Sequence, residues 1–239
     1  MKITIGHLFP DLLNLYGDRG NIAALTRRMQ ARGIETEVKS YGIDDDINFA
    51  DLDIVFIGGG SDREQLLVCK KLLTIKSDIT QYVENGGTLA AVCGGYQLLG
   101  HYYQLENEKI EGLKILDIYT VQGSPRLIGN IILDSDYIGT TVVGFENHGG
   151  RTFINSHKPL GKVLYGYGND GESGYEGVVY KNVVATYLHG PLLPKNPVLA
   201  DKIIENAVTK KDASFVLSDI DSALENTAHD YIIKRFLKK

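Results

Sequence analysis

The sequence has few cysteines: Cys69 and Cys93 are the two among 239 residues. Two cysteines cannot form the disulfide framework of a small secreted domain, and without a Cys-x-x-Cys pair they do not indicate a zinc site. No stretch approaches the roughly 18 apolar residues that a membrane-spanning helix needs. The first residues also lack the apolar core and cleavage site of a signal peptide. We therefore expect a cytoplasmic protein with free thiols, no metal site and no membrane insertion.

Positive charge is also scarce. Lys and Arg number 25 against 30 Asp and Glu, so the formal net charge is -5. The basic runs are short, as in Arg27-Arg28, whereas binding to a phosphate backbone needs clustered Lys and Arg. The sequence therefore argues against a nucleic-acid partner.

The first hundred residues alternate between strand and helix patterns. Continuous apolar strands between helices predict a mostly parallel sheet covered on both faces, and in such sheets ligands bind beyond the carboxyl ends of the strands. The expected strands are 3–5, 35–38, 53–57 and 88–92, and the expected helices are 21–29, 63–75, 79–84 and one that opens at 96.

The middle of the chain has a different pattern, with short strands separated by Gly, Asn and Asp, which is typical of antiparallel hairpins. These strands are expected at 114–121, 127–133, 138–145, 162–165, 176–180 and 183–188, and helices return at about 196–208 and 221–237. No proline-rich or low-complexity linker divides the chain. We expect one α/β domain over residues 1–239, a central sheet with β-rich antiparallel additions.

Cys93 follows the apolar strand 88–92 directly and precedes Gly94-Gly95 and a helix. A strand that ends in a sharp glycine-flanked turn before a helix lifts the turn residue above the sheet, as in a nucleophile elbow. The helix amino terminus lowers the thiol pKa and offers backbone N–H groups to developing negative charge. Cys69 lies within an expected helix without such a context, so we interpret it as a packing residue.

The segment from Cys93 to Gln97 resembles the Cys-x-Gly-x-Gln signature of class I (triad) glutamine amidotransferases, and Gly58-Gly59-Gly60 resembles their upstream glycine turn. The resemblance implies a class I glutamine amidotransferase-like (flavodoxin-like) fold and a glutaminase activity. It also implies an oxyanion hole made by backbone amides of Gly94 and of Gly59 or Gly60.

His189 is the expected base. It follows the apolar strand 183–188, precedes Gly190-Pro191 and lies 96 residues after Cys93. A histidine at a strand end before a forced turn is typical of a positioned base, and these amidotransferases place their histidine downstream in the same way. Cys93 would attack the glutamine amide, and His189 would protonate the departing ammonia.

The family's His-x-Glu pattern is broken here, because Pro191 stands where the acid is expected. An imidazole without an acid is poorly held in the required tautomer. Either another acid of this chain, such as Glu146, approaches His189, or a partner subunit supplies one.

A histidine segment that lacks this acid resembles that of the cobyric-acid-synthase-like branch of the amidotransferases. Longer segments resemble the glutaminase subunits of lipid II isoglutaminyl synthases. The chain has no GxxxxGK[ST] motif and no room for an ATP-binding domain, so we expect no cofactor on it. The resemblance implies a Mur-ligase-like synthetase partner (MurT), in a 1:1 heterodimer, that holds ATP and Mg and amidates the α-carboxylate of D-glutamate in the peptidoglycan stem peptide. The resembling segments are 11–21, 56–65, 93–97, 144–151 and 187–191.

Further site residues are expected from the same resemblance. Arg126 matches an arginine that contacts the glutamine substrate, and a guanidinium suits its α-carboxylate. Gln97 and His148 are expected to line the site, His148 from a polar, glycine-rich loop. We assign Asp18 and Arg19 no role beyond structure or partner contact.

Three other functions are open. The chain could serve a synthetase for another acid, such as a cobyrinate-type substrate, and the protein that co-purifies would tell. A partner-independent γ-glutamyl or peptide hydrolase would turn over alone and accept substituted amides. A non-catalytic binding module would not react at Cys93 with a glutamine-like electrophile.

Overall fold

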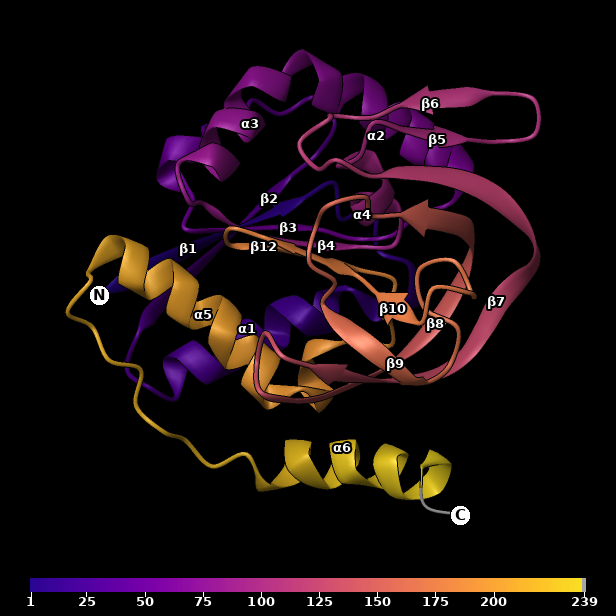
Figure 1. Cartoon of the computed structure of the whole chain (residues 1–239). Coiled ribbons are helices and arrows are strands. Elements are labelled where there is room, and N and C mark those ends of the chain that lie inside the picture. Colours follow the sequence, from indigo (N-terminus) through magenta and orange to yellow (C-terminus); the bar gives the residue numbers. More distant parts are fainter. Residues whose placement is uncertain (238–239) are drawn as a thin grey trace.

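The computed structural model describes residues 1–237, apart from the side chain of Tyr16. Its centre is a six-stranded sheet in the order β11-β12-β4-β3-β1-β2 (Figure 1). Five of these strands are parallel, and β11 joins β12 antiparallel at one edge. The strands span Lys2–Leu8 (β1), Glu35–Tyr41 (β2), Ile54–Ile57 (β3), Thr88–Val92 (β4), Val178–Tyr180 (β11) and Val183–Thr186 (β12).

Helices cover both faces of this sheet, as the sequence predicts (Figure 1). Successive strand residues face opposite sides, so in β3 Val55 and Ile57 belong to one core cluster and Ile54 and Phe56 to the other. Helices α2 (Asp62–Thr74) and α3 (Lys76–Glu84) pack on the first face, and α1 (Arg19–Gln30) and α5 (Pro197–Lys211) on the second.

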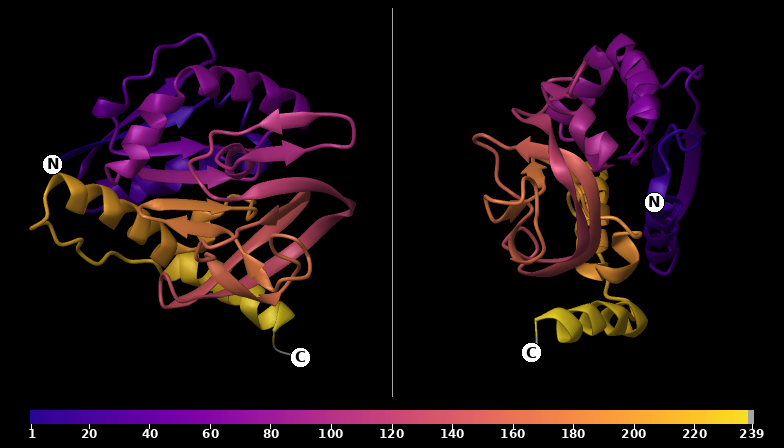
Figure 2. Two further views of the ribbon diagram at one scale, coloured as in Figure 1. Left: turned by 45° about the horizontal axis from the view of Figure 1, so that its top comes forward. Right: turned by 90° about the vertical axis from the view of Figure 1, so that its right-hand side faces the viewer.

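A second, largely antiparallel sheet lies beside the first, in the order β10-β9-β7-β5-β6 with β8 paired to β7. Helix α6 packs on η3 and β8 and lies apart from the main sheet at the end of a long connection (Figure 2). The remaining elements are η1 (Leu15–Gly17), η2 (Phe49–Asp51), α4 (Gly94–Leu98), β5 (Tyr102–Gln104), β6 (Lys109–Glu111), β7 (Tyr119–Ser135), β8 (Thr140–Phe153), β9 (Gly161–Tyr165), β10 (Tyr175–Glu176), η3 (Leu193–Lys195) and α6 (Ala223–Phe236).

The prediction of an antiparallel strand at 183–188 was wrong in its pairing. β12 ends at Thr186 and runs parallel to β4, and its antiparallel neighbour is the short β11. All four residues of β12 are buried, which is the pattern of a strand covered on both faces. This pairing sets the carboxyl end of β12 beside that of β4, with Thr186 opposite Val92.

The predicted strands 114–121 and 127–133 are not separate. One strand, β7, runs through both, and an irregularity in its pairing with β8 between Gln122 and Leu127 absorbs the Gly-Ser-Pro segment. Residues 114–118 precede the strand. The polar stretch 145–151, predicted as a loop, belongs to strand β8, because β7 pairs with it almost throughout. Strands β5 and β6 were not predicted from the sequence.

Candidate active site

Cys93 lies between β4 and α4 with φ of 51° and ψ of −104°. A positive φ at a residue other than glycine is strained and occurs chiefly where surrounding structure imposes it. Two contacts hold the turn: Cys93 N–H donates to Thr186 O at 2.9 Å, and Gly95 N–H donates to Gly58 O at 3.1 Å. A Cβ on Gly95 would lie 2.6 Å from Ile57 O, so glycine is needed there. Cys93 as a whole residue is half-buried.

The glycine turn 58–60 follows β3, the neighbour of β4. A Cβ added to Gly59 would lie 3.0 Å from Cys93 Cβ and 3.4 Å from His189 Cε1. Both side chains therefore converge on one small region beside Gly59. The three segments meet there because they leave adjacent parallel strands at the same edge of the sheet.

His189 lies three residues beyond β12 and is buried. Its backbone forms an isolated bridge with Phe145 of β8, with N–H to O distances of 2.8 and 3.3 Å in the two directions. Pro191, which stands in place of the family acid, packs against the start of α1, where a Cβ on Gly20 would lie 2.5 Å from the proline ring. The residue at the position of the missing acid thus has a packing role.

The electrostatic environment keeps Cys93 and His189 uncharged. Burial, reinforced by the charge of Asp18, raises the pKa of Cys93 to about 12, although Gly94 N–H and Arg126 act in the opposite direction. Burial, together with the charges of His148 and Arg126, lowers the pKa of His189 to about 3. At neutral pH the site therefore holds a thiol and a neutral imidazole rather than a thiolate–imidazolium pair.

Glu146, the acid that we considered for His189, is bound elsewhere. Its two carboxylate oxygens accept the N–H groups of Tyr167 and Gly168 at 2.7 and 2.9 Å. It also lies 3.8 Å from His148 Nε2. Burial, His148 and Arg126 are the causes that lower the pKa of His189, and Glu146 is not among them.

Arg126 lies in β7 at the pairing irregularity, and its side chain is held over β8. Its Nε donates to Asn147 Oδ1 at 3.1 Å and its Nη2 to Asn147 O at 3.0 Å. The guanidinium charge acts on the pKa of both Cys93 and His189. Arg126 thus lies near both residues, and its Nη1, which has no hydrogen-bond partner among the described residues, can donate to an anionic group.

Gln97 and His148 belong to a buried polar network. Tyr187, a residue that sequence reasoning missed, lies at the centre of this network. Gln97 Nε2 donates to the Tyr187 hydroxyl at 3.0 Å, and His148 stacks on the Tyr187 ring with centroids 3.7 Å apart. Glu176 was also missed. It is fully buried, accepts Thr186 Oγ1–H and Tyr187 N–H at 2.7 Å each, and has a pKa raised to about 8 by burial.

Asp18 is a second acid that the sequence did not assign to the site. It is 1% exposed, and its Oδ2 accepts Gly59 N–H at 2.8 Å. One of the two predicted oxyanion donors of the glycine turn is therefore already bonded. Burial raises the pKa of Asp18 to about 7. The only sequence signal for a role of Asp18 in the site was its place between a strand and a helix at the carboxyl edge of the sheet.

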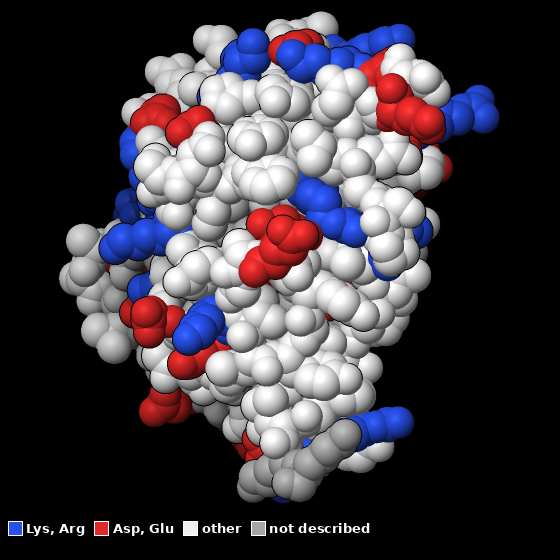
Figure 3. Space-filling model, turned by 45° about the vertical axis from the view of Figure 1, so that its right-hand side comes forward, with Lys and Arg blue, Asp and Glu red and all other residues white. Residues whose placement is uncertain are grey.

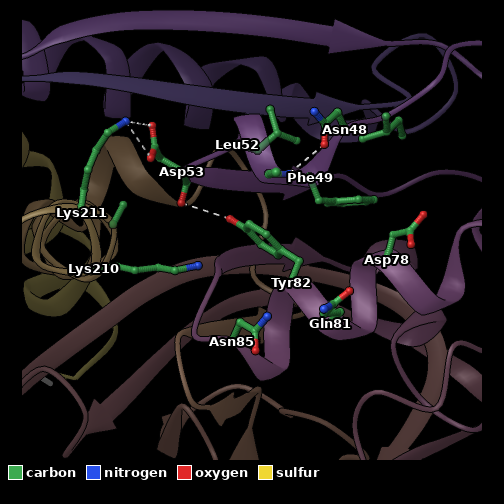
Figure 4. A pocket seen from close by; sticks show the side chains of 13 residues that line it. Asn48, Phe49, Leu52, Asp53, Asp78, Gln81, Tyr82, Asn85, Lys210 and Lys211 are labelled. Carbon is green, nitrogen blue, oxygen red and sulfur yellow. Dashed lines mark hydrogen bonds and ion pairs between the residues drawn. The ribbon is translucent and has the colours of Figure 1, made fainter.

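A cavity of about 600 Å³ lies at the opposite edge of the main sheet from Cys93. Its lining residues precede β3, lie in α3 or directly after it, or lie in the last turns of α5 (Figure 4), so the cavity opens at the amino-terminal edge of the sheet. Lys211 points to Asp53, with N–O distances of 2.9 and 3.0 Å, and Tyr82 donates to Asp53 O at 3.1 Å. Within the described part of the chain, no three His, Cys, Asp or Glu residues are grouped to hold a metal, and no helix is both long and apolar enough to span a membrane.

A strand-end cysteine elbow, a neighbouring glycine turn and a strand-end histidine on a mostly parallel sheet define the glutamine amidotransferase class. Residues 4–197 match the CobB/CobQ-like glutamine amidotransferase domain, and the chain belongs to that family. This confirms the predicted class of enzyme.

Two relatives are subunit GatD of lipid II isoglutaminyl synthase (glutamine-hydrolyzing). The protein from Staphylococcus aureus (strain N315) is 46% identical, with 98% of this chain and 96% of that protein covered. The protein from Streptococcus pneumoniae (strain ATCC BAA-255 / R6) is 42% identical, with 88% and 82% covered. Both likenesses confirm the resemblance seen in the sequence.

A crystal structure of a glutamine amidotransferase from Thermotoga maritima superposes with a TM-score of 0.55 at 12% identity and covers 99% of each chain. At that identity the likeness concerns the fold alone, and it confirms the predicted fold class.

Proposed function

We propose that this chain hydrolyses L-glutamine to glutamate and ammonia through a thioester on Cys93, and that it supplies the ammonia to a separate synthetase subunit. The observation that carries the proposal is the convergence of Cys93 and His189 beside Gly59. A nucleophile and a base on one side of a backbone turn are what acyl transfer requires.

The reaction has two halves. Cys93 Sγ attacks the side-chain amide carbon of glutamine while its proton passes to His189, and the carbonyl oxygen takes the negative charge under the backbone N–H groups of Gly94 and the glycine turn. The C–N bond then breaks, and His189 returns the proton to the leaving ammonia. Water, deprotonated by His189, attacks the thioester carbon, and the C–S bond breaks to give glutamate and free thiol.

The neutral thiol and imidazole favour a partner that completes the site. A carboxylate brought next to His189 would raise its pKa, and the imidazolium that it stabilises would lower the pKa of Cys93. The homologous chains are named as subunits of lipid II isoglutaminyl synthase. The proposed partner is a Mur-ligase-like subunit (MurT) in a 1:1 heterodimer. It would hold ATP and Mg, activate the α-carboxylate of D-glutamate in lipid II and supply the acid.

The face over β7 to β9 suits such a partner. Figure 3 shows that broad areas of this side carry few charged side chains. Ile128 is 50% exposed, and it pairs in register with Asn147, which holds Arg126. Exposed apolar residues are typical of protein interfaces; others in or near these strands are Leu164, Tyr165, Tyr167 and Tyr175.

The two cysteines provide a matched test of the nucleophile. Cys93→Ala should lower ammonia release from glutamine to background, whereas Cys69→Ala should keep it, because Cys69 lies in α2 with its thiol on Glu111 O. Circular dichroism confirms that both variants are folded. Glutamine hydrolysis by folded Cys93→Ala would refute the proposal.

A further inference from the structure

Asp18 does not cap the helix that follows it, although it occupies the capping position. It stands at the amino-terminal end of α1, where an aspartate commonly caps the helix, yet its side chain makes no capping hydrogen bond. The carboxyl turns to the glycine turn 41 residues further on, where it accepts Gly59 N–H. A buried carboxyl is unfavourable unless it is hydrogen-bonded, so this contact fixes both partners.

The glycine turn is shaped around this carboxyl. A Cβ on Gly58 would lie 2.6 Å from Asp18 Oδ2, so only glycine lets the acid approach. The carbonyl groups of the turn are also held: Gly58 O by Gly95 N–H, Gly59 O by Leu15 N–H at 3.0 Å, and Gly60 O by Gln65 Nε2 at 3.2 Å.

The other two amides of the turn are those of Gly58 and Gly60. Both residues are buried, and neither N–H has a hydrogen-bond partner among the described residues. Buried backbone N–H groups are rarely left without one, so these donors, of which Gly60 N–H follows the anchored Gly59, are available to a ligand. Gly94 N–H lies next to the Cys93 thiol.

We propose that Asp18 is a positioning residue for glutamine hydrolysis: by accepting Gly59 N–H it holds the glycine turn so that Gly60 N–H, with Gly94 N–H, faces the oxyanion. The inference rests on the proposed reaction at Cys93. It assigns Gly60 rather than Gly59 as the donor of the turn, because the Gly59 amide is engaged.

The charge of Asp18 has a second consequence, since it opposes ionisation of Cys93. The other charged groups that act on this thiol are Arg126 and Asp62, and the imidazole of His189 lies beside Gly59. A neutral Asp18 carboxyl still accepts Gly59 N–H through its carbonyl oxygen. Removing the charge while keeping an acceptor oxygen should therefore make the thiol more acidic and leave the turn in place.

The test compares Asp18→Asn, which keeps an acceptor, with Asp18→Ala, which does not, in the full chain with its co-purifying synthetase. Loss of one oxyanion donor lowers kcat roughly 100- to 1000-fold. Asp18→Ala should misplace such a donor and therefore lower kcat at least about 10-fold. The KM for glutamine should stay within about threefold of its value in the unmodified chain. Asp18→Asn should keep kcat within about threefold. Arg19→Ala, at the next residue and with an exposed side chain at the start of α1, should match the unmodified chain.

Two results would overturn the role of Asp18: an unchanged kcat in Asp18→Ala, or equal losses in Asp18→Ala and Asp18→Asn. If Asp18→Ala does not fold, Asp18→Ser replaces it, because the shorter side chain cannot reach Gly59 N–H.

The rate of Cys93 alkylation, measured as a function of pH, gives an independent readout. Cys93 in Asp18→Asn should react at lower pH than in the unmodified chain. An unchanged midpoint would contradict the proximity of charge and thiol. The loss of hydrolysis in Cys93→Ala tests the reaction separately.

Discussion

Arg126 can be tested separately from the chemistry at Cys93. If its guanidinium binds the α-carboxylate of glutamine, Arg126→Ala should raise KM for glutamine about 10-fold or more, the cost of a charge-assisted pair. Steady-state ammonia release measures KM. Arg126→Lys should recover part of the loss, because it keeps the charge without the planar fork. Iodoacetamide should still alkylate Cys93 in both variants, and an unchanged KM in Arg126→Ala would exclude Arg126 from the substrate site.

Glu176 should make stability depend on pH. Its pKa is about 8 in the folded chain, against an ordinary value of 4.5. Between these values the folded state holds a proton that the unfolded state has lost, so stability falls as pH rises from 4.5 through 8. The full effect is on the order of a few kcal/mol.

Urea unfolding at pH 6.5 and 8.5 measures this effect. The unmodified chain should lose more stability over that interval than Glu176→Gln, whose amide does not titrate. Asp18, with a pKa raised to about 7, acts in the same direction in both proteins and cancels in the comparison. Equal losses would show that Glu176 is not a buried protonated acid.

The sequence located Cys93 and His189 because their signals are local: an apolar strand followed at once by glycine or by a forced turn. Asp18 and Glu176 escaped because their partners are distant in the chain. Asp18 binds Gly59 across 41 residues, and Glu176 in β10 binds Tyr187, the residue after β12. No local pattern distinguishes a buried acid of this kind from a surface one.

The elbow between β4 and α4 depends on its packing against β3. A Cβ on Gly95 would lie 2.6 Å from Ile57 O and 3.0 Å from Gly58 O, and these backbone atoms cannot move aside. Gly95→Ala should therefore cost about 1–3 kcal/mol of stability, as overpacked sites do, and should lower glutaminase activity by displacing Cys93.

Gly129→Ala is the matched control for that substitution. Gly129 lies in β7, and its added Cβ would meet nothing within 4 Å. Its midpoint in urea should remain close to that of the unmodified chain. If Gly95→Ala is as stable and as active as Gly129→Ala, the close packing of the elbow is not required.

At the level of elements, the parallel core was predictable and the second sheet was only partly so. Apolar runs between helices specify buried parallel strands, and β4 was predicted to the residue. The pairing of β12 depends on its neighbour β4, almost a hundred residues earlier, and local turns suggested a hairpin instead. β7 was divided in the prediction because Gly123, Ser124 and Pro125 are typical loop residues, yet pairing with β8 resumes at Leu127.

The whole molecule is expected to be a weak glutaminase alone. With the pKa of His189 near 3 and that of Cys93 near 12, thiolate is scarce at neutral pH. Adding the co-purifying synthetase should raise ammonia release at least about 10-fold and shift Cys93 alkylation to lower pH, because a carboxylate at His189 stabilises the imidazolium. Equal rates with and without the synthetase, together with turnover of N-substituted glutamines, would instead indicate a γ-glutamyl hydrolase.

The most direct test of the account is to trap the covalent intermediate. The chain and its synthetase are mixed with L-glutamine, quenched in acid during turnover and digested for mass spectrometry. The account predicts a γ-glutamyl thioester on the peptide that contains Cys93, none on the peptide that contains Cys69, and none on either in Cys93→Ala. Continued ammonia release from Cys93→Ala, or a glutamyl adduct on another residue, would contradict it.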